Sequence, residues 1–143
     1  MRSTFVLFIL FLALVSILSE ALSPATTPEQ VILSQLTALQ QDDMSGVYEF
    51  ASPVNKQRTG DVITFGQMVR SGPYRYLIHH KRADILMAST IAASKQYLVR
   101  VFPDDSIPTS SAKKVVEYWW SLSRCKTGPN AGCYMVDAVI PNL

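Results

Sequence analysis

Two adjacent carboxylates, Asp42 and Asp43, are the residues of this chain that first suggest chemistry. A close pair of carboxylates can share a proton and act as a general acid and base. However, the pair lies in ALQQDDMSGVYEFASP, between two segments with helical patterning. An Asp in such a position accepts hydrogen bonds from the free N–H groups of a helix N-terminus. We therefore interpret Asp42 as lying just past one helix and Asp43 as capping the next.

A second possible site resembles that of an isomerase. Such an enzyme needs a carboxylate base in an apolar pocket and a tyrosine hydroxyl that stabilises the developing oxyanion. Asp137 lies on an otherwise apolar segment, and Tyr118 and Tyr74 could supply the hydroxyl groups. The simpler interpretation is that Asp137 faces solvent or forms an ion pair with an arginine such as Arg70 or Arg75.

Other catalytic and metal-binding patterns are missing from the sequence. His79 and His80 are adjacent, and neighbouring residues of a strand point to opposite faces, so they are poorly placed to bind one metal. The HHKR segment is better explained as a solvated basic patch. Two cysteines without further ligands make a poor zinc site, and no G-x-S-x-G elbow, phosphate-binding glycine loop or C-x-x-C pair is present. We predict no metal site and no cofactor.

The N-terminus has the pattern of a secretory signal peptide. Arg2 precedes an apolar run over residues 5–18, and Ser19 and Ala21 suit a cleavage site after residue 21. The run is shorter than the roughly 20 apolar residues of a membrane span. We predict a signal peptide over residues 1–21 and a secreted or secretory-pathway protein; the alternative is an uncleaved leader that anchors the chain in a membrane. The net charge of +2 is too small to indicate a nucleic-acid partner.

The compartment determines whether Cys125 and Cys133 are expected to be oxidised. These two residues lie at the ends of the CKTGPNAGC turn. In an oxidising compartment two such cysteines are expected to form a disulfide. The alternative is a pair of reduced, buried cysteines.

The rest of the chain reads as a linker over residues 22–27 and one domain over residues 28–143. Apolar periodicity and cap residues predict helices at 28–41, 44–51 and 61–70. The intervening NKQRTG segment is polar and loop-like, and residues 74–77 suit a short strand or an extended loop. Alternating patterns then predict strands at 83–88, 96–102, 115–124 and 133–140. Helices followed by an antiparallel sheet define the α+β class.

Two of these strands carry large apolar groups on both faces. In residues 115–124 we expect one set of alternate side chains to face the helices and the other set to face outward. In residues 133–140 we place Tyr134, Val136, Ala138 and Ile140 on one face. Apolar groups on both faces are consistent with a strongly curved sheet that holds helices on its concave side.

Three blocks of sequence resemble a known family. LTALQQDDMSGVYEFASPVNKQRTG, FGQMVRSGPYRYL and GCYMVDAVI resemble domain-of-unknown-function family 4864, although Tyr134 stands where that family often has tryptophan. The family is similar to the nuclear-transport-factor-2-like (cystatin-like) fold group, which implies N-terminal helices in the concavity of a curved antiparallel sheet. The resemblance implies no activity, because the family has none assigned. The wider fold group includes isomerases, dehydratases, cyclases and many plain binding or dimerisation modules, so the fold does not indicate a function.

Two functions remain open, and we favour the first. In the first, the domain is a non-catalytic interaction or dimerisation module that binds a copy of itself or a partner, which predicts an exposed apolar patch of Trp119, Met135 and Val139. In the second, it binds a small apolar molecule, or acts on one as an isomerase-like or dehydratase-like enzyme, in a pocket between helices and sheet. The candidate pocket residues are Phe50, Met68, Tyr74, Tyr118, Trp120 and Asp137.

Overall fold

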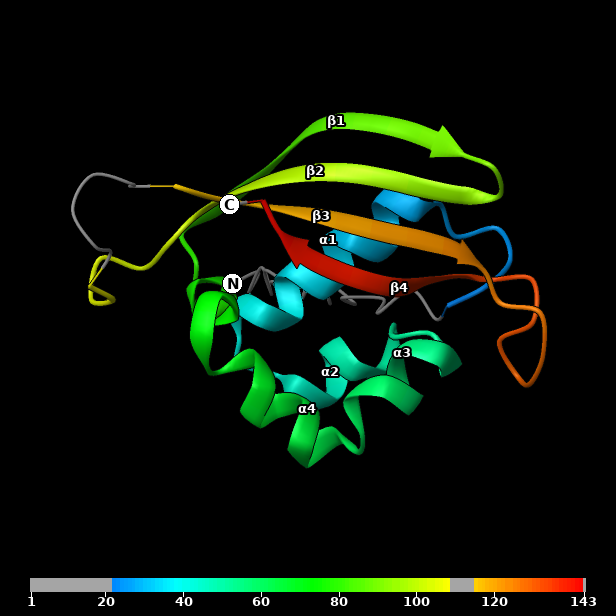
Figure 1. Ribbon diagram of the computed structural model, residues 1–143, viewed down its shortest axis with the longest axis horizontal. Helices are drawn as coiled ribbons and strands as arrows, with labels where there is room; N and C mark the ends of the chain where they lie inside the picture. The colour runs from blue at the N-terminus through cyan, green and yellow to red at the C-terminus, as the bar shows by residue number, and fades with distance from the viewer. Residues whose placement is uncertain (1–21, 109–114, 143) are drawn as a thin grey trace, which may run out of the picture.

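The computed structural model describes residues 22–108 and 115–142, so the predicted signal peptide lies outside the described residues. Helices come first and an antiparallel sheet follows, which confirms the α+β class. In Figure 1 the sheet arches over α1, and α2, α3 and α4 lie together below it. None of the helices in the described ranges has the length and apolar character that crossing a bilayer requires. The elements are α1 (Pro28–Gln40), α2 (Met44–Glu49), α3 (Pro53–Thr59), α4 (Val62–Val69), the 3-10 helix η1 (Gly72–Leu77), β1 (Arg82–Ile91), β2 (Ser94–Phe102), β3 (Val116–Arg124) and β4 (Tyr134–Pro141).

The two adjacent aspartates separate α1 from α2. Asp43 is the N-cap of α2, and its carboxylate accepts a hydrogen bond of 3.0 Å from the Gly46 N–H. Asp42 follows α1 with a positive φ of 53° and forms a 2.8 Å ion pair with Arg70. Their predicted role as the end of one helix and the cap of the next is confirmed.

Two segments differ from their predicted conformation. NKQRTG is not a loop, because residues 53–59 form α3, which Ser52 caps by accepting a hydrogen bond from the Asn55 N–H. Pro53 begins this helix instead of only ending the previous one, since proline at the first helical position sacrifices no hydrogen bond. Residues 74–77 are likewise not extended but belong to the 3-10 helix η1.

The sheet is antiparallel with the strand order β1-β2-β3-β4. On β3 the side chains of Tyr118, Trp120 and Leu122 are fully buried, as the alternation predicted. A register shift next to Ser121 leaves Asp137 without a partner in the β3–β4 pairing. The shift pairs Val139 with Trp120, so the predicted assignment of β4 side chains to faces was wrong at the C-terminal half of the strand.

A buried glutamine joins the sheet to two helices. Gln35 on α1 is 3% exposed, and its side-chain oxygen accepts a 2.9 Å hydrogen bond from the Trp120 indole on β3. Its amide group donates a 3.0 Å hydrogen bond to the Val47 carbonyl on α2. Since both polar ends of Gln35 are bound, the amide fixes α1 and α2 relative to the sheet at low desolvation cost.

The structure contains no disulfide between Cys125 and Cys133, and both residues are free cysteines. The Cys125 thiol donates to the carbonyl of Thr127 within its own turn, at 3.1 Å, while Cys133 is buried. The two backbones are nonetheless paired, because the Cys125 N–H donates to the Cys133 carbonyl at 2.7 Å. The disulfide predicted from the sequence is therefore not formed in this structure.

The predicted basic patch is also only partly correct. His79 is exposed, but His80 is only 4% exposed and its Nδ1 lies 2.7 Å from the Leu77 carbonyl oxygen. The Gln40 side chain at the end of α1 donates to the His80 carbonyl at 3.0 Å. Burial of the imidazole lowers the pKa of His80, an effect that its hydrogen bond to Leu77 opposes.

We predict that Gln35→Met lowers the free energy of unfolding by about 2 kcal/mol, because the buried Trp120 N–H loses its acceptor while the side-chain volume is nearly kept. Urea titration of the variant and of the wild type measures the change. Gln67→Met, at an exposed position of α4, is the matched control and should change stability by less than about 0.5 kcal/mol. A Gln35→Met loss no larger than that of the control would contradict the assigned role.

We also predict that His80 makes the protein less stable in mild acid. The unfolded chain protonates its histidine near pH 6.5, whereas the folded chain resists protonation, so stability falls as pH decreases through and below about 6.5. His80→Asn keeps a donor for the Leu77 carbonyl and should remove up to about 1 kcal/mol of the difference in unfolding free energy between pH 7.5 and 5.5. His79→Asn, which removes the neighbouring exposed imidazole, is the comparison variant; equal effects of the two variants would refute the assignment.

Candidate functional site

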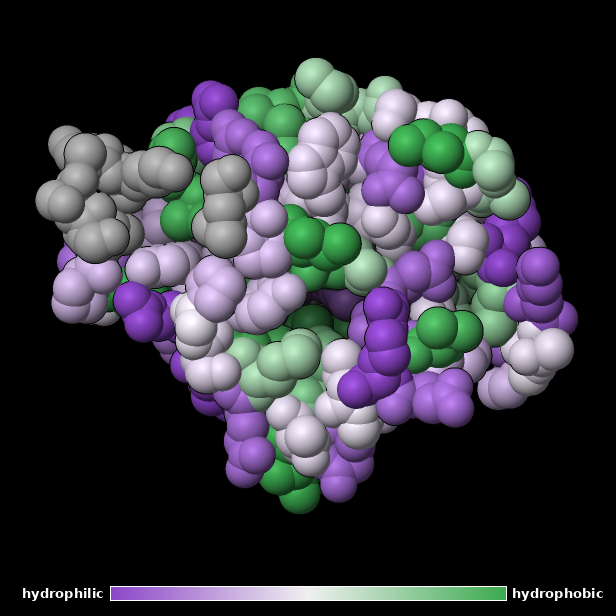
Figure 2. Space-filling view, viewed as in Figure 1, coloured by the Kyte–Doolittle hydropathy of each residue, from purple (hydrophilic) through white to green (hydrophobic). Residues whose placement is uncertain are grey.

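A cavity of about 240 Å³ lies between the β4 end of the sheet and the helices. In the space-filling view a hollow opens on this face, with hydrophobic and hydrophilic side chains on its rim (Figure 2). Its wall is mainly apolar, with a few polar groups from α1, α3 and η1. The lining residues are Gln35, Leu39, Val47, Asn55, Arg58, Thr59, Phe65, Met68, Val69, Tyr74, Leu77, Trp120, Val136, Ala138, Val139 and Ile140.

The outer edge of β4 explains why the cavity is there. Backbone pairing along this edge is confined to one parallel bridge between Ala51 and Val136 within the described residues. Beyond the bridge, side chains take the place of a strand: Arg58 donates to the Asp137 carbonyl, and the Tyr74 hydroxyl donates to the Val139 carbonyl at 3.0 Å. Long side chains from α3 and η1 thus satisfy these carbonyl groups, and the cavity lies beside them.

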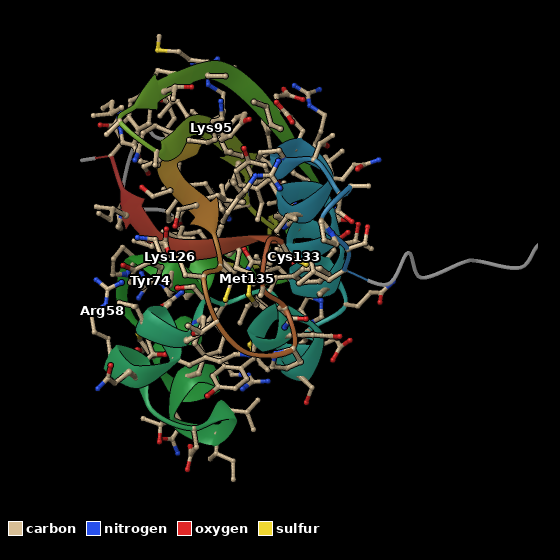
Figure 3. The ribbon with its side chains drawn as sticks, turned by 90° about the vertical axis from the view of Figure 1, so that its right-hand side faces the viewer. Arg58, Tyr74, Lys95, Lys126, Cys133 and Met135 are labelled. Atoms are coloured by element: carbon tan, nitrogen blue, oxygen red, sulfur yellow. The ribbon has the colours of Figure 1, made fainter. Side chains whose placement is uncertain are left out.

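Arg58 and Tyr74 lie on the same side of the molecule, between β4 and the green helices, in the side-chain view (Figure 3). Arg58 comes from α3 and Tyr74 from η1, and both line the cavity. Their polar ends meet carbonyl groups two residues apart on the same strand. The two side chains therefore lie at neighbouring points along the β4 side of the cavity.

Asn55 supplies a further polar group to the cavity wall. Its side-chain amide donates a 3.1 Å hydrogen bond to the Val136 carbonyl, and the residue is 8% exposed. No hydrogen bond to the Asn55 side-chain oxygen is formed within the described residues. Since every fully enclosed side-chain polar atom in those residues has a partner, this oxygen is open to the cavity or its mouth. It can accept a hydrogen bond from a bound molecule.

Titratable groups are few in the cavity wall. Arg58 and Tyr74 are the titratable residues that line it, and no Asp, Glu, His, Lys or Cys is among the described lining residues. Burial raises the pKa of Tyr74, so its hydroxyl stays protonated at neutral pH and acts as a hydrogen-bond donor. The described residues hold no group of His, Cys, Asp and Glu suited to a metal ion. The described lining residues therefore include no carboxylate, imidazole or amine that could act as a general base.

The candidate pocket residues predicted from sequence divide into two sets. Met68, Tyr74 and Trp120 line the cavity, whereas Phe50, Tyr118 and Asp137 do not. The Tyr118 ring packs edge-on against Trp120 and stacks near Tyr74, and its hydroxyl donates to a backbone carbonyl of η1. The Asp137 carboxylate accepts a 2.6 Å hydrogen bond from Ser123. Asp137, Tyr118 and Tyr74 therefore do not form a shared isomerase-like site.

Sequence reasoning missed Asn55, Arg58 and Thr59, which all line the cavity. They lie at positions i, i+3 and i+4, which share one face of a helix. The segment was interpreted as a loop, so this face was not recognised. The Ser-Pro pair before Val54 was the available signal, because serine caps and proline begins a helix.

Sequence comparison matches residues 22–118 to the family described as a domain of unknown function, DUF4864. No curated protein and no solved structure matches the chain. The match spans more than half of the 143 residues and includes the helices that form one wall of the cavity, while β4 lies beyond it. The family predicted from the sequence blocks is thus confirmed, and the chain belongs to the DUF4864 family.

Proposed function

We propose that this protein binds a small, largely apolar molecule in the cavity between the sheet and α3, α4 and η1. The observation that carries the proposal is the size and chemistry of the cavity. Its volume of about 240 Å³ equals that of about eight water molecules in the liquid. An apolar wall with a few polar groups is typical of ligand sites, and this volume suits a ligand smaller than a drug molecule.

Several contacts favour binding over carboxylate-base catalysis. An isomerase-type base must reach the substrate, but the Asp137 carboxylate is bound by Ser123 and does not line the cavity. The Tyr74 hydroxyl donates its proton to the Val139 carbonyl, so its oxygen, like the Asn55 amide oxygen, can accept a hydrogen bond from a ligand. We therefore place the protein among binding proteins, with the isomerase-like or dehydratase-like enzyme as the alternative.

We also propose a more specific fold group for the domain. Assignment to the nuclear-transport-factor-2-like (cystatin-like) group is supported by the order of helices before an antiparallel sheet and by the way the sheet arches over α1 (Figure 1). A cavity between helices and sheet is compatible with that assignment, although fold alone does not assign a ligand.

A second candidate function is self-association. The predicted patch of Trp119, Met135 and Val139 is not formed, because Met135 is 1% exposed and Val139 lines the cavity. Among the large apolar side chains that are exposed, Leu86, Met87 and Ile91 lie together on the edge strand β1. Apolar groups gathered on one strand favour contact with another protein surface, and we propose a second copy as the partner.

We also retain the proposal that the mature protein is secreted or lies in the lumen of the secretory pathway. It rests on the leader pattern of residues 1–21. In that compartment Cys125 and Cys133 would join in a disulfide after the Cys125 side chain turns away from Thr127. Their backbones are already hydrogen-bonded to each other, which supports the pairing.

We predict that toluene, p-cresol or indole binds the cavity and that Val139→Phe weakens binding at least tenfold. Val139 lies opposite Trp120 in the sheet and lines the cavity, so a phenyl ring there fills the space. NMR titration can follow the indole N–H signals of both tryptophans. The Trp120 signal should shift, whereas that of Trp119, which does not line the cavity, should not.

Val54→Phe is the matched control, since Val54 is 61% exposed on α3 and does not line the cavity. It should bind the probes as the wild type does. Circular dichroism of both variants shows whether each is folded. The proposal fails if none of the three probes shifts the Trp120 signal, or if the two folded variants bind a probe equally well.

Native mass spectrometry of protein purified from its own source tests compartment and self-association together. We expect a chain that lacks residues 1–21, a mass lower by two hydrogen atoms for the disulfide, and a dimer at micromolar concentration. Met87→Lys should reduce the dimer fraction by placing a charge among exposed apolar groups. A full-length chain, two free thiols or a monomer would each contradict the corresponding proposal.

A further inference from the structure

Arg58, an exposed residue of α3, brings a positive charge to the wall of a mainly apolar cavity. The one hydrogen bond of its side chain within the described residues goes to the Asp137 carbonyl, which is neutral. Ion pairs among those residues involve other arginines and lysines, and none includes Arg58. The guanidinium has five N–H donors, so most of its hydrogen-bonding capacity remains for a ligand or water.

Neighbouring charged groups do not supply the missing anion. The carboxylate on β4 is that of Asp137. It accepts a hydrogen bond from Ser123 and forms no ion pair with Arg58. Asn55 and Thr59, on the same face of α3, are neutral. The cavity wall therefore presents one uncompensated positive charge beside apolar surface.

We propose that the ligand is a small organic carboxylate with an apolar body. The apolar part occupies the cavity against Phe65, Met68 and Trp120, and the carboxylate pairs with the Arg58 guanidinium at the mouth. This inference rests on the proposed function above and specifies its ligand class. A planar guanidinium matches a carboxylate through two parallel hydrogen bonds.

A single cation also argues against more highly charged ligands. Lys56, the other basic residue near the middle of α3, lies over the Tyr48 ring at 4.9 Å and is not part of the cavity wall. A phosphate monoester carries close to two negative charges at neutral pH, which one arginine does not balance. A monocarboxylate matches both the charge and the volume of the site.

Binding of a matched pair of probes, 4-methylbenzoate and the neutral 4-methylbenzyl alcohol, tests the inference. We expect the wild type to bind the acid about tenfold more tightly than the alcohol at pH 7 and low salt, by calorimetry and by the Trp120 indole signal. Arg58→Gln keeps a donor for the Asp137 carbonyl and removes the charge, so it should abolish this preference by weakening acid binding more than alcohol binding. High salt should reduce the wild-type preference because the mouth is exposed to solvent.

Arg75→Gln is the matched control, since Arg75 is exposed on η1, stacks on Tyr76 and does not line the cavity. It should keep the preference for the acid. Equal binding of acid and alcohol by the wild type overturns the inference and leaves the proposed function standing. Equal weakening of both probes by Arg58→Gln also overturns it, since Arg58 would then only support β4. Binding of neither probe by the wild type overturns the proposed function together with the inference.

Discussion

The buried hydrogen bond from Trp120 to Gln35 is the contact on which the other arrangements depend. It joins the centre of β3 to α1, and the second bond of Gln35, to the Val47 carbonyl, sets the position of α2. From α2 the chain passes directly to Ala51, which forms the bridge to Val136 on β4. An apolar pair at these positions would bury as much surface but would leave the helices free to slide, because hydrophobic contacts are non-directional. The directional amide thus determines where the β4 edge is covered and where it is left open.

The cavity is a consequence of how that edge is protected. A strand edge exposes unpaired N–H and C=O groups, which proteins cover with strands, helices or side chains. At Val136 both the N–H and the carbonyl group are bonded to the backbone of residues 50 and 52. Further along β4, single side-chain donors from Arg58 and Tyr74 bind the carbonyl groups instead. A single donor satisfies a carbonyl without bringing its whole helix against the strand. The edge is therefore protected against other chains while space for a small molecule is kept beside it.

Much of the fold could be predicted from local patterns, but the cavity could not. The periodicity of α1, the Asp43 cap and the alternation on β3 each have one dominant physical cause and were predicted correctly. Pro53 was ambiguous, because proline ends one helix as readily as it begins another, and choosing the first meaning hid Arg58. The register shift beside Asp137 depends on pairing between strands, so it is invisible in either strand alone. The first error overlooked a local cap signal and the second concerned tertiary context, and both affected the same cavity wall.

The charges of the chain show why the acidic pair was a poor guide to function. Asp42 pairs with Arg70, and Arg100 pairs with Glu117, so these charges are compensated within the fold. Compensated surface pairs contribute little to stability and carry little information about a ligand. Arg58 is different, because it lines the cavity and its side-chain hydrogen bond goes to a neutral carbonyl and not to a carboxylate. A search for paired acids finds residues that other side chains of the fold already bind, whereas a cavity-lining cation without an anion partner is where we propose that a ligand binds.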